Sequence, residues 1–155
     1  MRLLLLAVGR LRPALREVCD DYRRRVGRMV TLDEQEVREA GRLPAGAMRR
    51  EEEDRRILAL LPDGMPVTLL DPTGSPWSSE EVAERLDQWR LEARDRAVVI
   101  GGAEGVGAAV RARADQRWSL GPMILPHELA RVVVVEQLYR ATTILRGEPY
   151  HRGSS

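Results

Sequence analysis

Residues 97–105 read AVVIGGAEG, an apolar run of four residues that leads directly into a glycine-rich turn. An unbroken apolar run closed by glycine predicts a strand buried on both faces, as in a parallel sheet. Gly101 and Gly102 permit backbone geometry, or a close approach of a ligand, that a Cβ atom would block. The stretch therefore predicts an interior strand followed by a turn at the carboxyl edge of a parallel sheet.

The alternation of an apolar run, a turn and an amphipathic segment extends in both directions from this stretch. Strands are predicted at residues 3–8, 29–37, 67–70, 97–100 and 118–120. Helices are predicted at residues 13–26, 48–61, 78–93, 106–114 and 127–145. A capping box of Ser78 and Glu81 opens the third helix. Five alternations predict an α/β fold with a mostly parallel sheet flanked by helices.

Length and composition narrow the class of protein. A chain of 155 residues, 43% hydrophobic and 32% charged, is expected to form one globular domain over residues 1–155. The 25 basic residues are all arginine and nearly balance 24 acidic residues, so the chain is no global polycation. Arginine makes planar bidentate contacts with phosphate and stacks on bases, although surface solvation is the simpler explanation for any single arginine.

The cysteine count and the length of the apolar stretches exclude several classes of protein. The lone Cys19 cannot form an internal disulfide, and no Cys pair has the spacing of a zinc site, so no metal is expected. The longest apolar stretch near the start, residues 3–8, is far shorter than the roughly 20 residues of a transmembrane helix. We therefore expect a cytoplasmic protein without a membrane partner.

Three loops at the predicted carboxyl edge are candidates for a ligand site, namely residues 70–76, 101–105 and 120–126. The glycine loop is either a tight turn or a ligand loop, since it matches neither the dinucleotide fingerprint nor a P-loop. The last loop holds MIL between two prolines. It either plugs the core or offers backbone N–H and C=O groups to a purine edge while its apolar side chains pack on the ring.

Polar candidates concentrate near the carboxyl end of the chain. His127 is explained as a helix N-terminal residue, and Glu136 with Arg140 as an i, i+4 ion pair. The tail at 148–152, EPYHR, places an aromatic ring, an imidazole and a guanidinium together, which suits stacking on a base and binding of phosphate. A frayed terminus is the alternative. Residues 153–155 are expected to be flexible.

Five motifs follow one another in the second half of the chain. They read IGGAEG at 100–105, WSL at 118–120, LPH at 125–127, EQLYRA at 136–141 and PYHR at 149–152. In order and spacing they resemble the RlmH family, ribosomal RNA large subunit methyltransferase H. The opening strand and the segment after the third strand extend the resemblance to nearly the whole chain. The chain departs from the family pattern at Ala103, where proline is usual, and at Ser75, where a basic residue is frequent.

The resemblance implies a fold and a function. RlmH enzymes are SPOUT-class methyltransferases with a C-terminal trefoil knot, so a knotted cofactor-binding region is expected at about residues 66–147, with a tail at residues 148–155. The family uses S-adenosyl-L-methionine to methylate N3 of a pseudouridine in helix 69 of 23S rRNA on the assembled 70S ribosome. The resemblance therefore implies a homodimer acting on large-subunit ribosomal RNA, without DNA as a partner.

The expected site residues stand at the positions that match the family motifs. The cofactor-binding set is Leu70, Gly102, Leu120, Gly121, Pro122, Met123, Ile124, Leu125 and Pro126. The catalytic set is Tyr150, His151, Arg152 and Arg140. We expect His151 or an ordered water to accept the N3 proton. Arg152 or Arg140 would stabilise negative charge on the base carbonyls, and Tyr150 would orient the base.

Two other functions stay open at this point. One is a non-catalytic RNA-binding or ribosome-binding module that retains the fold, and the other is a nucleotide-binding or hydrolytic α/β domain. The absence of phosphate-binding motifs weighs against the hydrolytic domain. The three intact cofactor loops weigh against the non-catalytic module.

Overall fold

The computed structural model describes residues 1–152, in which strands and helices alternate as predicted. The strands are β1 (Arg2–Val8), β2 (Thr31–Val37), β3 (Val67–Pro76), β4 (Arg96–Ile100) and β5 (Gln116–Ser119). The helices are α1 (Pro13–Val26), α2 (Ala47–Leu60), α3 (Ser79–Glu92), α4 (Ala108–Arg113), α5 (His127–Leu145) and the 3₁₀-helix η1 (Pro149–Arg152). The expectation of flexibility for residues 153–155 lies outside the described residues.

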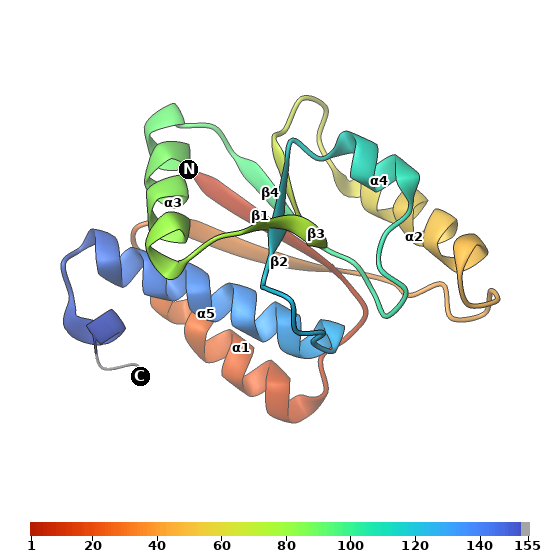
Figure 1. Ribbon diagram of the computed structural model, residues 1–155, viewed down its shortest axis with the longest axis horizontal. Helices are drawn as coiled ribbons and strands as arrows, with labels where there is room; N and C mark the ends of the chain where they lie inside the picture. The colour runs from red at the N-terminus through yellow and green to blue at the C-terminus, as the bar shows by residue number, and fades with distance from the viewer. Residues whose placement is uncertain (153–155) are drawn as a thin grey trace.

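The five strands form one parallel sheet in the order β2-β1-β4-β3-β5. Helices α1, α3 and α5 cover one face of the sheet, and α2 and α4 cover the other (Figure 1). Strand β4, which carries the apolar run of residues 97–100, lies in the middle of the sheet and is buried along its whole length. The prediction of a mostly parallel sheet flanked by helices is confirmed.

The side chains of β1 alternate between two apolar cores, one on each face of the sheet. Leu3 and Leu5 pack into the core under α1, α3 and α5, whereas Leu6 and Val8 pack into the core under α2 and α4. Successive side chains of a strand point to opposite faces, so an apolar run without polar interruptions is required when both faces are covered.

Strand β3 continues beyond the expected end at Leu70 and reaches Pro76. Its pairing with β5 shifts between Leu70 and Ser75, which leaves an irregular segment inside the strand. The Asp71 carboxylate stabilises this segment by accepting hydrogen bonds from the N–H and the hydroxyl of Thr73, both at 2.9 Å. The turn residues predicted after the strand are therefore a bulged part of the strand itself.

Helix α4 is shorter than the predicted range of 106–114. It begins after Gly107 because the buried Asp54 carboxylate of α2 accepts hydrogen bonds from the N–H groups of Gly107 (2.9 Å) and Val110 (3.1 Å). At the other end, the N–H of Asp115 donates to a β3 carbonyl and starts the path of β5. Contacts with distant elements thus set both helix boundaries.

Helix α5 is held against the sheet by Arg131, whose side chain is only 1% exposed. Its guanidinium pairs with Glu34 (3.0 Å) and Glu36 (2.7 Å) of β2, and it donates to the Gly9 carbonyl after β1 (2.9 Å). These contacts fix the start of α5 beside the carboxyl ends of β1 and β2.

None of the helices in residues 1–152 is long and apolar enough to cross a membrane.

Candidate functional site

The loop at residues 120–126 exposes its apolar side chains. Ile124 is 97% exposed and Met123 is 77% exposed, so the interpretation of this loop as a core plug is wrong. Within residues 1–152, no hydrogen bond engages the backbone N–H of Met123, Ile124 or Leu125. Free N–H donors beside exposed apolar side chains suit a flat heterocycle such as a purine. The ligand-loop interpretation fits this geometry.

Both ends of this loop are fixed. The Ser119 hydroxyl accepts a hydrogen bond from the N–H of Gly121 (3.0 Å), and Leu120 packs partly buried against the core. At the other end, the carbonyl of Pro126 accepts the first hydrogen bond of α5 from Ala130 (2.9 Å). The loop therefore presents an unpaired middle between two rigid ends.

The glycine loop that follows β4 is a tight turn. The N–H of Gly105 donates to the carbonyl of Gly102 (3.0 Å), and Gly105 adopts a φ of +73°. A Cβ on Gly101 would lie 2.9 Å from the carbonyl carbon of Gly105, too close for any other residue. The turn geometry is confirmed, and the role of Gly102 in binding a ligand stays a prediction. The turn follows β4, which pairs with β3, and β3 in turn pairs with β5.

Glu53 of α2 is an acidic residue outside the predicted sets of site residues. Its side chain is buried, and its Oε2 accepts a hydrogen bond from the N–H of Ala40 (3.0 Å). Its Oε1 has no hydrogen-bond partner in the part of the chain that the structure describes. A Cβ placed on Gly102 would lie 3.3 Å from this oxygen. A buried acceptor without a partner is unusual, and a hydrogen-bond donor on a ligand at the glycine loop would satisfy it.

Glu53 precedes the buried Ile57 by one helical turn. An acidic residue on the apolar face of a predicted helix is the sequence signal that identifies such a buried carboxylate.

Asp71 joins the irregular segment of β3 to its neighbours. The buried carboxylate pairs with Arg111 of α4 and lies 3.8 Å from Arg117 of β5. Leu70, directly before it, packs partly buried against the core. Because Arg111 follows Asp71 by 40 residues, no local sequence pattern reveals this contact. It holds the β3 segment against α4 and against β5, the strand that leads into the loop at residues 120–126.

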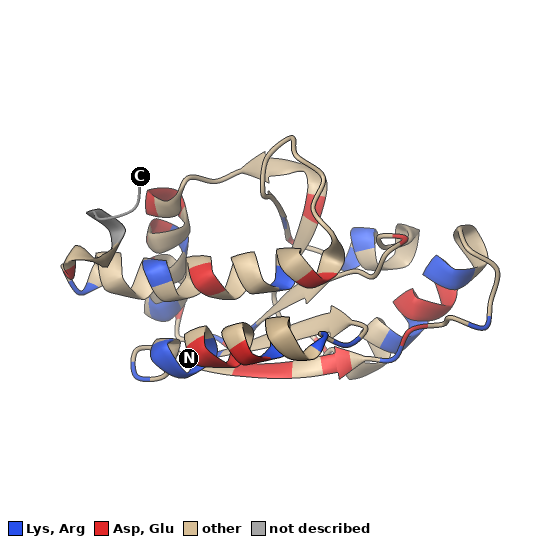
Figure 2. Ribbon diagram, turned by 90° about the horizontal axis from the view of Figure 1, so that it is seen from below, with Lys and Arg blue, Asp and Glu red and all other residues tan. Residues whose placement is uncertain are grey.

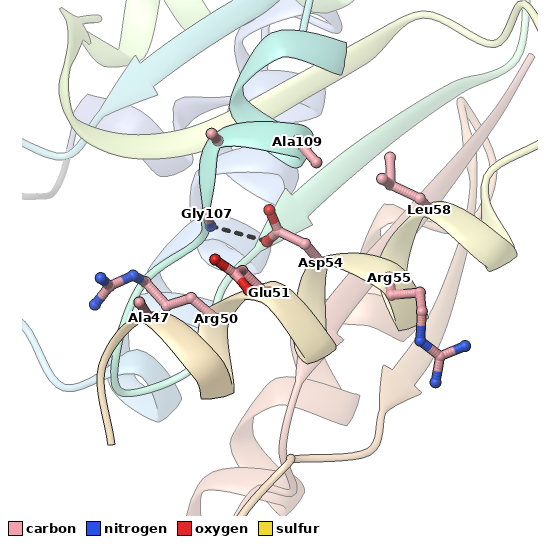
Figure 3. A pocket seen from close by; sticks show the side chains of 9 residues that line it. Ala47, Arg50, Glu51, Asp54, Arg55, Leu58, Gly107 and Ala109 are labelled. Atoms are coloured by element: carbon pink, nitrogen blue, oxygen red, sulfur yellow. Dashed lines mark hydrogen bonds between the residues drawn. The ribbon is translucent and has the colours of Figure 1, made fainter. Parts of the chain in front are cut away.

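A cavity of about 490 Å³ lies between α2 and α4. Figure 3 shows Asp54 pointing across it to Gly107, while Arg50 and Arg55 extend away from it on either side. Gly107 lines the cavity and belongs to the segment that follows the glycine loop. Residues 120–126 do not line this cavity, so it is separate from the predicted cofactor site.

Glu136 of α5 contacts two of the four predicted catalytic residues, Arg140 and Tyr150. Its Oε1 accepts hydrogen bonds from Nη2 of Arg140 (2.8 Å) and from the hydroxyl of Tyr150 (3.0 Å). The Arg140 guanidinium lies 4.8 Å from the centre of the Tyr150 ring. Burial, together with hydrogen bonds to Tyr22 and Glu136, raises the pKa of Tyr150. Tyr150 is therefore a neutral phenol at physiological pH.

The first part of the tail is packed rather than frayed. The ring of Tyr150 meets that of Tyr139 edge to face at 4.8 Å, and Tyr139 lies 5.9 Å from Tyr22 of α1. The backbone of His151 and Arg152 belongs to η1. Their catalytic roles stay predictions.

The structure does not bring the two predicted sets of site residues together in one chain. Glu136, which binds Tyr150, follows Pro126 by ten residues, a separation of about 15 Å along a helix axis. Figure 1 shows η1 and the loop that precedes α5 near opposite ends of this helix. Among the described residues, no group of His, Cys, Asp and Glu side chains could hold a metal ion.

Comparison with known proteins identifies the family. The family described as "Predicted SPOUT methyltransferase" matches residues 1–151. This chain belongs to the SPOUT methyltransferase family. The membership agrees with the expected fold class and with S-adenosyl-L-methionine as the expected cofactor. The trefoil knot expected within this fold stays a prediction.

Individual relatives of this SPOUT methyltransferase match it from end to end. A protein of Anaeromyxobacter sp. (strain Fw109-5) is 46% identical over 153 residues, and one of Gemmatimonas aurantiaca is 48% identical over 154 residues. Both alignments cover 98% of this chain and 100% of the relative. Each relative is named "Ribosomal RNA large subunit methyltransferase H".

A solved structure confirms the fold of this SPOUT methyltransferase. A probable methylase family protein from Haemophilus influenzae Rd KW20 superimposes with a TM-score of 0.54. The superposition covers 94% of this chain and 66% of that one, at 10% sequence identity. At this identity the likeness concerns the fold alone.

Proposed function

We propose that this chain methylates large-subunit ribosomal RNA with S-adenosyl-L-methionine. The proposed target is N3 of a pseudouridine in helix 69 of 23S rRNA on the assembled 70S ribosome, and the proposed active unit is a homodimer in the cytoplasm. The proposal of rRNA as the substrate rests on one observation, namely sequence identity above 45% to relatives of about the same length that are named for this activity. The position of the modified atom comes from the resemblance of the motifs to the RlmH family.

The carboxyl edge of the sheet supplies groups that fit the cofactor. The free N–H groups of residues 123–125 would bind the adenine edge, with Met123 and Ile124 against the ring. Leu70 and Gly102 border the same edge on the neighbouring strands. The unpaired Oε1 of Glu53 would accept a hydrogen bond from a hydroxyl or ammonium group of the cofactor.

Methylation at N3 requires positioning of the base and removal of the imide proton. When bound, S-adenosyl-L-methionine supplies the methyl group, whose bond to sulfur breaks as the bond to N3 forms. His151 would accept the N3 proton, and Arg152 or Arg140 would stabilise the negative charge spread over the base carbonyls. Tyr150, whose hydroxyl donates to Glu136, would orient the base. Alignment of the two reacting atoms would provide much of the acceleration.

Substitution of His151 tests this assignment. His151→Ala should lower the rate of methyl transfer strongly and leave the dissociation constant of S-adenosyl-L-homocysteine unchanged in calorimetry. Full activity of this variant would reject His151 as the base. A protein that binds ribosomes but has no affinity for either cofactor form would instead be the non-catalytic module.

The separation of loop and tail within one chain supports a site shared between two protomers. Val18 of α1 and Leu129 of α5 are exposed apolar residues on adjacent helices, which suits a covered surface in a dimer. Each active site would then combine residues 120–126 of one protomer with the tail of its partner.

Mixing two inactive variants tests the shared site. His151→Ala damages the tail, and Gly121→Val damages the loop because Gly121 has a φ of +108°. In a shared site, a mixed dimer has one intact site, so co-refolded equal amounts should recover about a quarter of the wild-type activity. Activity no higher than that of the separate variants, with mixed dimers verified by mass, would reject the shared site.

A further inference from the structure

A groove of about 670 Å³ lies where the C-terminal parts of α1, α3 and α5 meet. Five arginines line it, namely Arg24, Arg25, Arg28, Arg90 and Arg146. We call this set the arginine groove. Figure 2 shows blue segments at the C-terminal ends of α1 and α5. The near-zero net charge of the chain therefore conceals a local concentration of positive charge.

Nearby carboxylates neutralise only part of this charge. Glu148 pairs with Arg146 at 2.7 Å, and Asp21 lies 3.2 Å from Arg25 and 3.7 Å from Arg24. Two carboxylates thus face five guanidinium groups. Such exposed ion pairs contribute little to stability and exchange readily for a phosphate oxygen.

Two members of the groove have no partner in the described chain. No hydrogen bond or ion pair of residues 1–152 engages the guanidinium of Arg28 or Arg90. Arg28 is exposed in the turn after α1, and Arg90 is partly exposed on the last turn of α3. Their ten N–H donors are directed to solvent or to a ligand.

Helix dipoles account for some of these arginines but not for the whole set. Cations at a helix C-terminus are stabilised by the partial negative charge there, and this effect decays within the last turn. Arg24, Arg25 and Arg90 satisfy this condition. Arg28 follows Gly27 outside the helix, so the α1 dipole does not explain it.

The groove adjoins the tail. Arg146 and Glu148 line it directly before η1 begins at Pro149. Arg25 lies 5.9 Å from the centre of the Tyr139 ring, and Tyr139 contacts Tyr150. A polyanion in the groove would therefore continue past the aromatic residues to the tail that we propose to contact the target base.

We infer that the arginine groove binds the phosphate backbone of the substrate RNA next to the target nucleotide, an inference that rests on the proposed rRNA methylation. Arginine matches this ligand because its planar fork binds two phosphate oxygens at once. The adjacent tyrosines match RNA rather than an acidic peptide, because unpaired bases stack on aromatic rings. The groove then determines the affinity and position of the RNA, and the loops at the sheet edge bind the cofactor.

The test removes positive charge from the groove without touching the proposed catalytic residues. Arg28→Gln, Arg90→Gln and the double variant are compared with Arg55→Gln, which removes an exposed arginine on α2, on the other face of the sheet. Thermal unfolding and calorimetry with S-adenosyl-L-homocysteine should be unchanged in all four variants. The readout is binding to 70S ribosomes that lack the modification, and to the isolated helix 69 hairpin, over a range of salt concentrations.

Each groove substitution should weaken binding about tenfold, equivalent to about 1.4 kcal/mol. The slope of log K against log salt should fall by about 0.7 to 0.9 for each phosphate group that the variant no longer neutralises. For methylation, KM for ribosomes should rise while kcat at saturation stays near the wild-type value. Arg55→Gln should behave as wild type.

Groove variants that match Arg55→Gln in both affinity and salt slope would overturn the inference. This outcome is distinguishable from failure of the proposed function. If the wild-type protein binds ribosomes without methylating them, the function fails, and the binding comparison still decides the groove. If the wild-type protein binds neither ribosomes nor the hairpin, both fail.

Discussion

Gly74 lies where the irregular segment of β3 passes closest to β5, and its replacement by alanine gives a sharp test of how the fold holds the site. A Cβ at this position would lie 2.6 Å from both the carbonyl carbon and the oxygen of Arg117, and 2.9 Å from the nitrogen of Trp118. All three atoms belong to the backbone of a paired strand, so none can rotate away. Overpacking of this kind costs about 1–3 kcal/mol, and the lack of a flexible neighbour places Gly74→Ala near the upper end.

The expected decrease of about 2–3 kcal/mol in the free energy of unfolding can be measured by urea denaturation. Because β5 leads directly into the loop at residues 120–126, the dissociation constant of S-adenosyl-L-homocysteine should also rise by about tenfold or more. Gly41→Ala is the matched control, since a Cβ there meets no atom within 4 Å. It should change stability by less than about 1 kcal/mol. Equal stability and affinity of the two variants would refute the argument that the β3–β5 contact positions the loop.

Three further predictions concern single side chains. Ile124→Ala should change the free energy of unfolding by no more than about 0.5 kcal/mol, because the side chain is exposed. It should weaken the binding of S-adenosyl-L-homocysteine about fivefold in calorimetry, and an unchanged affinity would show that Ile124 does not belong to the site. Arg131→Ala removes the buried guanidinium that pairs with Glu34 and Glu36, while Arg16 still pairs with Glu34, and should cost about 3 kcal/mol in urea denaturation. A cost below about 1 kcal/mol would contradict the anchoring role. Burial opposes ionisation of Glu36, but the hydrogen bond and charge of Arg131, with the charge of Arg16, outweigh it and lower the pKa below 4.5. The stability that this ionised carboxylate contributes is present above about pH 4.5 and is lost as the pH falls through the lowered pKa. Glu36→Gln should therefore be less stable than wild type at pH 7 and approach the wild-type stability in acid. A stability difference that does not vary with pH would disprove this.

Most of the fold could be predicted because its signals are local. Unbroken apolar runs predict strands covered on both faces, and the capping box of Ser78 and Glu81 marks the start of α3 as observed. The rule that ligands bind at the carboxyl ends of parallel strands selected the three loops without any knowledge of the sheet order. The order β4-β3-β5 then places these loops on neighbouring strands.

The remaining features depend on contacts between distant residues. Asp54 sets the start of α4 from 53 residues away, and Asp71 binds an arginine 40 residues later, so neither contact has a local sequence signal. The exposure of Ile124 also contradicts its apolar character, because hydrophobicity alone favours a buried loop. Side chains that bind a ligand or a second chain can be exposed in the isolated chain, so hydrophobicity does not predict their burial there.

Methyl transfer to ribosomes tests the central claim most directly. Purified 70S ribosomes that lack the helix 69 modification are incubated with the protein and S-adenosyl-L-methionine labelled in its methyl group, beside free large subunits and protein-free 23S rRNA. Label is expected at N3 of a single pseudouridine in helix 69, with 70S ribosomes as the preferred substrate. Absence of label from all three substrates, under conditions where the cofactor is bound, would contradict it.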